Sequence, residues 1–292
     1  QTLIERFGTA GSQLIVFLGA KGGVGTSVLT QAAGDAIANR LRQKAIILDA
    51  AGGWSYLSVA MGTEPAITFR SAVRAARASD EDSFQRMIYN VDDCLSILNV
   101  GGDPMLEGAS DPDNLEYLID RLESVYPVVL FDASRVSVRE MRTVIARANA
   151  NIVVSTPTLA SLRHAQGLIH EIAKLRSGGD RKGNDKDKQR GDLELVLNMQ
   201  GANPAYEVEQ NYIAEIMETE PGLSIAYSPK TFMAAESQNE RISNTKGGDQ
   251  HIDTLVPLLK RHVQVSVRKH SGQRVKGYSK LIEKFIKRIG KT

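Results

Sequence analysis

A glycine-rich segment near the amino terminus carries residue types suited to holding phosphate groups. Residues 19–27 read G-A-K-G-G-V-G-T-S and follow an apolar run, Leu14–Leu18. In such a loop the backbone N–H groups surround the phosphates, a lysine reaches the β- and γ-phosphates, and a Ser or Thr hydroxyl binds Mg²⁺. The standard loop ends in G-K-S or G-K-T, but Thr26 occupies the lysine position here. Another lysine, Lys21, stands at the start of the loop.

The segments on both sides favour a phosphate-binding loop over a glycine-rich turn without a ligand. The preceding run has the continuous apolar, β-branched character of a strand buried on both faces. After the loop, apolar residues recur at helical spacing from Val28 to Leu41. A helix that begins there points its free N–H groups at an anion. The sequence therefore predicts that a nucleotide is bound by Gly22, Gly23, Val24, Gly25, Thr26 and Ser27.

Two carboxylates stand at the ends of other strand-like runs. Asp49 ends the run Ala45–Asp49, and Asp132 ends the run Pro127–Asp132. Ligands of open α/β sheets bind at the carboxyl ends of the strands, and a strand-terminal Asp supplies a carboxylate to the Mg²⁺ shell in phosphoryl-transfer proteins. We therefore expect Asp132 and the hydroxyl of Ser27 to bind Mg²⁺; the alternative role for Asp132 is a helix cap or a turn. For Asp49 we expect a catalytic role.

Strand-like runs alternate with helical stretches along most of the chain. This order predicts one α/β domain, residues 1–263, with a mostly parallel, doubly wound sheet of about seven strands flanked by helices, as in P-loop NTPases. Residues 176–191 contain no apolar side chain and are dense in charge and glycine, which predicts a mobile surface insertion, with nucleic-acid contact as the less favoured alternative. The expected strands are Gln13–Gly19, Ala45–Asp49, Cys94–Val100, Pro127–Asp132, Asn151–Ser155, Asp192–Asn198 and Leu223–Tyr227.

Composition indicates the cellular compartment in which the protein is expected. The chain has 292 residues, a formal net charge of +2 and one cysteine, Cys94, so it forms no internal disulfide, which fits a reducing cytoplasm. No apolar run reaches the roughly 18 residues that a membrane-spanning helix needs, so we expect a cytoplasmic protein. The first residue is Gln rather than Met, so we expect that an upstream segment was removed.

The last part of the chain, residues 264–292, is a basic tail. Between Lys260 and Thr292, eleven Lys or Arg residues stand against one acid, Glu283, so the preceding body is acidic. An anionic membrane surface attracts each such cation with about 1 kcal/mol. The targets left open are a membrane surface, packing on the body or on a partner protein, and, less favoured, nucleic acid. Residues 278–291 predict a basic amphipathic helix, whose apolar stripe comprises Tyr278, Leu281, Ile282, Phe285 and Ile289.

The loop K-G-G-V-G-T-S, with Lys21 first, resembles the deviant Walker A loop of the MinD/ParA superfamily. Members of that family are ATP-dependent dimers that position other molecules in bacterial cells. The resemblance covers residues 13–263 and implies ATP and Mg²⁺ as cofactors, a homodimer in which Lys21 reaches the partner's nucleotide, and contact of Asn198 with adenine. Lys21 is therefore, with Asp49, a candidate catalytic residue. Thr26 in place of the second lysine is similar to the CpaE/TadZ-type pilus-assembly branch, as is the stretch S-T-P-T-L-A-S-L-R over residues 155–163.

Departures from the family pattern bear on catalysis. Thr26 removes a cation, and Ala51 stands where the family usually has an Asp that positions the attacking water. Because the loss of one preorganised electrostatic contact costs about 10²–10³ in rate, we expect nucleotide binding with weak or absent hydrolysis. The residues after Asp132 are Ala, Ser and Arg135, without the usual Pro or Gly. Members of the pilus branch usually carry a receiver-like domain before the first strand; only about a dozen residues precede it here, so we expect that this domain is absent or was cut away.

The resemblance thus implies an ATP-binding, dimerising localisation or scaffold protein for pilus or secretion-system assembly. It would be cytoplasmic and peripheral at the inner face of the cell membrane or at a cell pole. Two alternatives remain: an active ATPase of the same superfamily that cycles on a membrane surface, and a DNA-partition ATPase.

Overall fold

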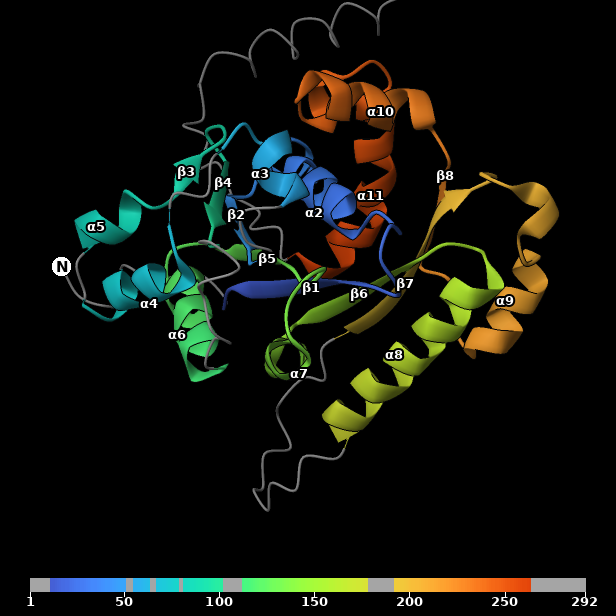
Figure 1. Cartoon of the computed structure of the whole chain (residues 1–292), viewed down its shortest axis with the longest axis horizontal. Coiled ribbons are helices and arrows are strands. Elements are labelled where there is room, and N and C mark those ends of the chain that lie inside the picture. Colours follow the sequence, from blue (N-terminus) through green and yellow to red (C-terminus); the bar gives the residue numbers. More distant parts are fainter. Residues whose placement is uncertain are drawn as a thin grey trace, which may run out of the picture.

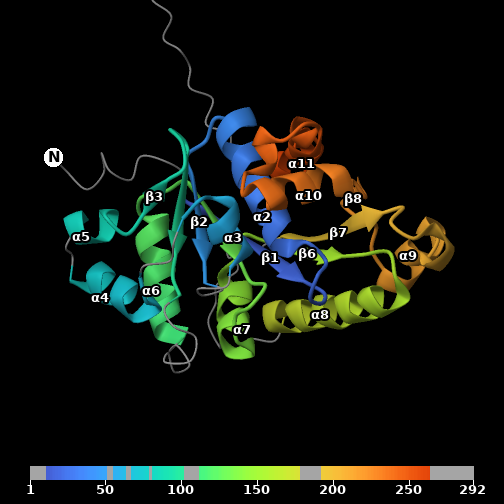
Figure 2. The ribbon, with the colours of Figure 1, turned by 45° about the horizontal axis from the view of Figure 1, so that its top comes forward.

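A computed structural model describes residues 11–50, 55–63, 67–78, 81–101, 112–177 and 192–263, and these residues build one eight-stranded sheet between two layers of helices (Figures 1 and 2). The strand order is β3-β4-β2-β5-β1-β6-β7-β8. All neighbouring strands run parallel except β3, which is antiparallel to β4. The strands are β1 (Gln13–Gly19), β2 (Ala45–Asp49), β3 (Tyr89–Asn90), β4 (Leu95–Asn99), β5 (Val128–Asp132), β6 (Ala150–Ser155), β7 (Asp192–Gln200) and β8 (Leu223–Ala226).

Each face of the sheet is covered by its own set of helices. One face carries α4 (Phe69–Arg77), α5 (Glu81–Gln85), α6 (Pro112–Glu123), α7 (Val138–Arg147), α8 (Leu159–Ser177) and α9 (Gln210–Met217). The other carries α2 (Thr26–Asp35) with its π-helical extension η1 (Ala36–Arg40), α3 (Tyr56–Ala60), α10 (Pro229–Gln238), η3 (Ile242–Asn244) and α11 (Gly248–His262). A short 3-10 turn, η2 (Pro204–Tyr206), follows β7.

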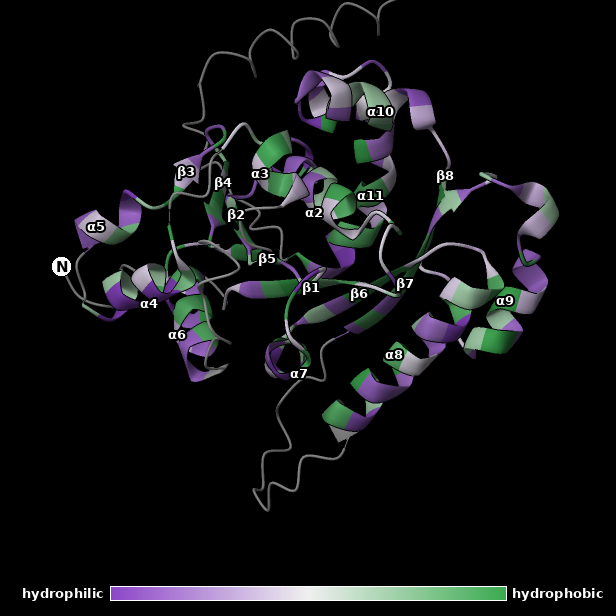
Figure 3. Cartoon of the chain, viewed as in Figure 1, coloured by the Kyte–Doolittle hydropathy of each residue, from purple (hydrophilic) through white to green (hydrophobic). Residues whose placement is uncertain are grey.

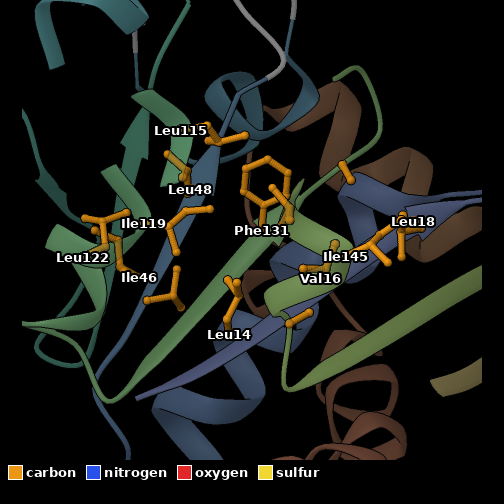
Figure 4. Packing of buried hydrophobic residues seen from close by; sticks show 14 of the residues in the cluster. Leu14, Val16, Leu18, Ile46, Leu48, Leu115, Ile119, Leu122, Phe131 and Ile145 are labelled. Carbon is orange, nitrogen blue, oxygen red and sulfur yellow. The ribbon is translucent and has the colours of Figure 1, made fainter. Parts of the chain in front are cut away.

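The alternation of side chains along the central strand divides the core in two. Leu14, Val16 and Leu18 of β1 pack in the core beneath α6 and α7, which Figure 4 shows from close by. Ile15 and Phe17 of the same strand point to the opposite core, under α2 and α11. Apolar residues therefore line the strands and the inner sides of the helices (Figure 3). A strand buried on both faces must be apolar at successive positions, as β1 is from Leu14 to Leu18.

The topology places a switch point in strand order at β1. The chain leaves β1 through α2 and reaches β2 on one side of it, whereas it leaves β5 through α7 and reaches β6 on the other side. Strand order reverses direction at β1, which lies between β5 and β6. Open α/β sheets bind their ligands at such a switch point, outside the carboxyl ends of the strands.

The predicted α/β fold and all seven predicted strands are confirmed, with one strand added. β3 was not predicted because it comprises two exposed residues without an apolar pattern. β7 continues two residues beyond the predicted end at Asn198. The predicted insertion begins too early, because α8 continues to Ser177; residues 178–191 and the basic tail 264–292 lie outside the described residues.

None of the helices in the described ranges combines the length and the apolar content that crossing a bilayer requires.

Candidate functional site

The loop between β1 and α2 is shaped by two glycines in the left-handed region. Gly23 has φ of 79° and Gly25 has φ of 90°, conformations that side chains with a Cβ rarely adopt. The N–H of Ala20 donates to the carbonyl of Val154 over 2.8 Å, which fixes the start of the loop on β6. Gly25 is the N-cap of α2 and has no side chain that could accept from the first N–H groups of the helix. Those groups are therefore available to an anion.

The glycines of the loop serve two different purposes. A Cβ added at Gly22 or at Gly23 would meet no atom within 4 Å among the described residues, so both border open space. A Cβ at Gly19 would lie 2.5 Å from Oγ1 of Thr26, and one at Gly25 would lie 2.5 Å from Nδ2 of Asn198. Two glycines thus leave room for a ligand, and two permit close packing of the loop against its surroundings.

Asn198, at the carboxyl end of β7, holds the loop from the side. Its Nδ2 donates a hydrogen bond to the carbonyl of Val24 over 2.8 Å, and the residue is almost fully buried. The structure thus gives this side chain a contact with the loop backbone that the sequence did not predict. Its predicted contact with adenine stays a prediction.

The structure brings Ser27, in the first turn of α2, close to Asp132 at the end of β5, and their predicted binding of Mg²⁺ stays a prediction. The hydroxyl of Ser27 is 3.2 Å from the hydroxyl of Ser134, and the N–H of Ser134 donates to Oδ1 of Asp132 over 3.0 Å. Asp132 is fully buried. Burial raises the pKa of its carboxyl group, and the hydroxyls of Ser27 and Ser134 together with the charge of Arg135 oppose that effect. Ser134 was not predicted, because nothing in the sequence links it to Ser27.

A cation fits this arrangement. Among the described residues, Oδ2 of Asp132 has no hydrogen-bond partner although it is buried, and buried polar atoms are otherwise almost always satisfied. Mg²⁺ binds to proteins through one or two carboxylates and takes its other ligands from hydroxyls, waters and phosphates. No group of three or more His, Cys, Asp or Glu side chains suited to a metal occurs in the described part of the chain. Asp132 and Ser27 offer one carboxylate and one hydroxyl, so an ion bound there would take its remaining ligands from waters or phosphate oxygens.

Asp49 belongs to a buried polar chain one strand farther from the loop. It pairs in register with Asp132 of β5 and with Asn99 of β4. Nδ2 of Asn99 donates to Oδ2 of Asp49 over 2.8 Å, and Oγ1 of Thr63 donates to Oδ1 of Asn99 over 2.8 Å. Asn99 and Thr63 were not predicted. The catalytic role of Asp49 stays a prediction, and Ala51 lies outside the described residues.

The two positions where a loop lysine is expected differ sharply. Thr26 is buried and faces Gly19, so the standard lysine position holds a small neutral side chain inside the protein. Lys21 is exposed and forms no ion pair with the described residues. At the standard position, the first residue of α2, the phosphate-binding loop therefore has no positive charge.

Comparison with known proteins shows which fold class this geometry defines. No family model matches the chain. It is 26% identical over 160 residues to the septum site-determining protein MinD of a Synechocystis strain; the match covers 54% of this chain and 58% of the length of that relative, which is less than two thirds. A ParA family ATPase from Chlorobium tepidum superposes with a TM-score of 0.71 at 17% identity, covering 85% of this chain and 97% of the other.

A second similar structure was solved with a nucleotide. It is the septum site-determining protein MinD of Pyrococcus horikoshii complexed with Mg-ADP, with a TM-score of 0.67 at 17% identity over 86% of this chain and 96% of the other. The protein therefore has the mostly parallel α/β fold of the MinD and ParA P-loop ATPases. The sequence similarity to MinD supports a relationship to that family. The finer assignment to its pilus-assembly branch rests on the loop and on residues 155–163 alone.

Proposed function

We propose that this chain binds ATP with Mg²⁺ at residues 21–27, forms a nucleotide-dependent dimer and hydrolyses ATP slowly or not at all. The observation that carries the proposal is the unpartnered, buried Oδ2 of Asp132 beside the Ser27 hydroxyl at the N-terminus of α2. A buried carboxylate oxygen without a donor is costly unless a cation joins it. The likeness to MinD and ParA proteins supports the same conclusion.

Each residue then has a defined task. The N–H groups of Gly22, Gly23 and Gly25 and the first turn of α2 bind phosphate oxygens. Ser27 and Asp132 hold Mg²⁺, which neutralises phosphate charge when it is bound. The polar chain through Asn99 keeps Asp49 in one position. Because Thr26 offers no charge, stabilisation of the charge that develops during phosphoryl transfer is weak, and so is hydrolysis.

Exposed apolar side chains beyond the carboxyl ends of the strands support dimer formation. Val138 begins α7 just beyond the end of β5, and its side chain is 73% exposed; Leu159 begins α8 just beyond β6 and is 49% exposed. Tyr206, which follows β7, is 76% exposed. Large exposed apolar side chains that gather at one edge mark interaction surfaces. The exposed Lys21 lies at the same edge, so a second copy that covers it would receive this lysine near its own nucleotide.

The cellular role that we favour is that of a scaffold or spatial landmark for a pilus or secretion assembly, bound at the membrane through residues 278–291. Thr26 in the loop and the stretch over residues 155–163 support this branch. The sequence similarity to MinD supports the alternative of an active ATPase that cycles on a membrane. A DNA-partition ATPase is the third candidate, and it requires duplex binding that weakens steeply with salt.

Calorimetric titration with ATP, in Mg²⁺ and in EDTA, tests the nucleotide site. The parent protein should bind ATP more tightly in Mg²⁺, and Ser27→Ala and Asp132→Asn should remove that difference. Ser237→Ala is the matched control, because Ser237 is an exposed serine on α10 whose hydroxyl donates to the carbonyl of Ala234 on the same helix. A parent protein that binds ATP in neither condition would overturn the proposal.

Steady-state hydrolysis separates the scaffold from the active ATPase. Turnover above about 0.01 per second, the rate of a slow nucleotide hydrolase, that is lost on Lys21→Ala favours the active ATPase. Turnover below that rate with intact ATP binding favours the scaffold.

A further inference from the structure

Three hydrogen-bond contacts fix the loop that follows β5: one to β1, one within the loop itself and one to the first turn of α2. The N–H of Ala133 donates to the carbonyl of Phe17 in β1 over 3.0 Å. The N–H of Ser134 donates to Asp132, and its hydroxyl is 3.2 Å from that of Ser27 in the first turn of α2. The next residue is Arg135, which is exposed. The backbone thus presents this arginine at the rim of the site that Ser27 and Asp132 form.

The charge of Arg135 is not committed to a partner within the described residues. Its guanidinium forms no ion pair within 4.0 Å there, whereas Arg40, Arg147 and Arg241 each contact two carboxylates. The electrostatic contact of Arg135 is with the buried Asp132, whose pKa it lowers against the larger effect of burial. A cation close to a metal-binding carboxylate and free of a salt bridge is available to a bound anion.

We propose that Arg135 binds the β- and γ-phosphates of the nucleotide and so supplies the positive charge that Thr26 does not. This inference rests on the proposed nucleotide-binding function. A nucleotide site needs cations to offset the phosphate charge, and the standard position for one is a buried threonine here. The guanidinium group suits the task because its planar set of donors binds phosphate oxygens in pairs. The positive charge at the phosphates then comes from Arg135, after β5, and not from position 26, at the start of α2.

The competing role for Arg135 is to screen the charge of Asp132. The two roles predict opposite signs. If Arg135 only screens, its removal leaves Asp132 a stronger Mg²⁺ ligand, and binding of ATP with Mg²⁺ stays the same or tightens. If Arg135 binds phosphate, its removal weakens ATP and ADP binding in Mg²⁺ and in EDTA, and it affects AMP little.

The experiment is equilibrium titration of the full chain with ATP, ADP and AMP, with and without Mg²⁺. Arg135→Ala should weaken ATP and ADP binding about 10- to 100-fold, the effect of losing a hydrogen-bonded charge, and Arg135→Lys should recover part of the loss. Arg139→Ala is the matched control, because Arg139, in the first turn of α7, is another exposed arginine that forms no ion pair with the described residues, and it should change affinity less than about twofold.

A second variant tests whether the arginine replaces the missing lysine. In the Arg135→Ala background, Thr26→Lys should restore ATP affinity, whereas Thr26→Met, of similar length but uncharged, should not. Thermal melting confirms which variants fold like the parent. If the parent binds ATP and Arg135→Ala binds it equally well or more tightly, the inference fails and the proposed function stands. A well-folded double variant that binds no better than Arg135→Ala also contradicts it. If the parent binds no nucleotide, the proposed function itself fails.

Discussion

The side-chain amide of Asn198 donates to the backbone carbonyl of Val24 over 2.8 Å, although the two residues are 174 positions apart. Both are almost fully buried. Val24 lies in the loop after β1 and Asn198 lies in β7, and β6 stands between these two strands. The amide therefore connects the phosphate-binding loop to β7 past the end of β6. The shape of the loop therefore depends on a residue far outside the glycine-rich motif.

Asn198→Ala should destabilise the fold and weaken nucleotide binding together. The change leaves the buried carbonyl of Val24 without its donor, which costs about 1–3 kcal/mol in the free energy of unfolding. Urea unfolding measures the loss, and titration with ATP measures the effect on the site. Asn203→Ala is the control, since Asn203 is exposed and caps η2 without a side-chain hydrogen bond. Equal stability of Asn198→Ala and the parent would show that the clamp is not needed.

Gly25→Ala should lower the melting temperature of the protein, whereas Gly22→Ala should not, because the two glycines have different surroundings. At Gly25 the added Cβ would sit in a left-handed backbone, at a cost of about 1–2 kcal/mol, and would overlap the Asn198 amide. We expect a lower melting temperature and weaker ATP binding. At Gly22 the Cβ meets open space, so the melting temperature should stay unchanged. A parent-like melting temperature for Gly25→Ala would contradict the described loop conformation.

Most of the fold followed from the sequence because its signals are local. Parallel strands buried on both faces appear as continuous apolar runs, and β1 and β5 show this at nearly every position. β3 gave no such signal, since its two residues are exposed and pair at the sheet edge. The insertion boundary was misplaced because charged residues can continue a helix, as they do at the end of α8.

The sequence predicted those residues of the candidate site whose type is required for phosphate or Mg²⁺ binding at that point of a known loop or strand end. The glycines, Ser27 and Asp132 stand at positions that phosphate or Mg²⁺ binding demands, and the structure brings Ser27 and Asp132 together. The partners of these residues were missed. Asn99 reaches Asp49 through strand register, and Ser134 reaches Ser27 through the path of the loop after β5; sequence spacing encodes neither contact. The role of Asn198 in the loop also depends on a contact between distant strands.

The pH dependence of stability should change on Asp35→Asn. Asp35, in the last turn of α2, is buried and contacts Arg241 over 2.8 Å; Arg241 also contacts Asp92 over 3.0 Å. Burial raises the pKa of Asp35 to about 6, against the lowering effects of Arg241 and of a hydrogen bond with Ser243 and alongside the raising effect of Asp92. Because the folded-state pKa is above the unfolded value of 3.8, the protonated form stabilises the fold at low pH.

That contribution is complete below about pH 4 and is lost as the pH rises through about 6, by up to about 3 kcal/mol. The parent should therefore lose free energy of unfolding between pH 4 and 7 relative to Asp35→Asn, whose amide does not titrate. Urea unfolding across this range measures both slopes. Parallel curves for the two proteins would show that Asp35 does not titrate in this window.

Rebuilding the two altered family positions should raise ATP hydrolysis. Thr26→Lys returns a cation to the loop, and Ala51→Asp returns a carboxylate that can position water. Each missing contact accounts for about 10²–10³ in rate, so the double variant should exceed the parent by at least tenfold in steady-state phosphate release. Each single variant serves as a control for the other. An unchanged rate in a double variant that binds ATP would place the defect elsewhere, and the altered stretch from Ala133 to Arg135 would be the next segment to test.

The tail should bind anionic vesicles through one face of residues 278–291. Phe285 lies in the middle of the apolar stripe, so Phe285→Glu should abolish sedimentation with phosphatidylserine vesicles and leave ATP affinity intact. Phe285→Leu, which keeps the apolar side chain, should still sediment. Binding should weaken as salt rises, because the lysines supply the attraction. If the parent does not bind such vesicles even with ATP, the membrane proposal fails.

Deletion of residues 276–292 then decides between the remaining roles of the tail. If the tail is a helix packed on the body, its deletion should lower the melting temperature. If the tail binds a partner protein or nucleic acid, its deletion should leave the melting temperature unchanged.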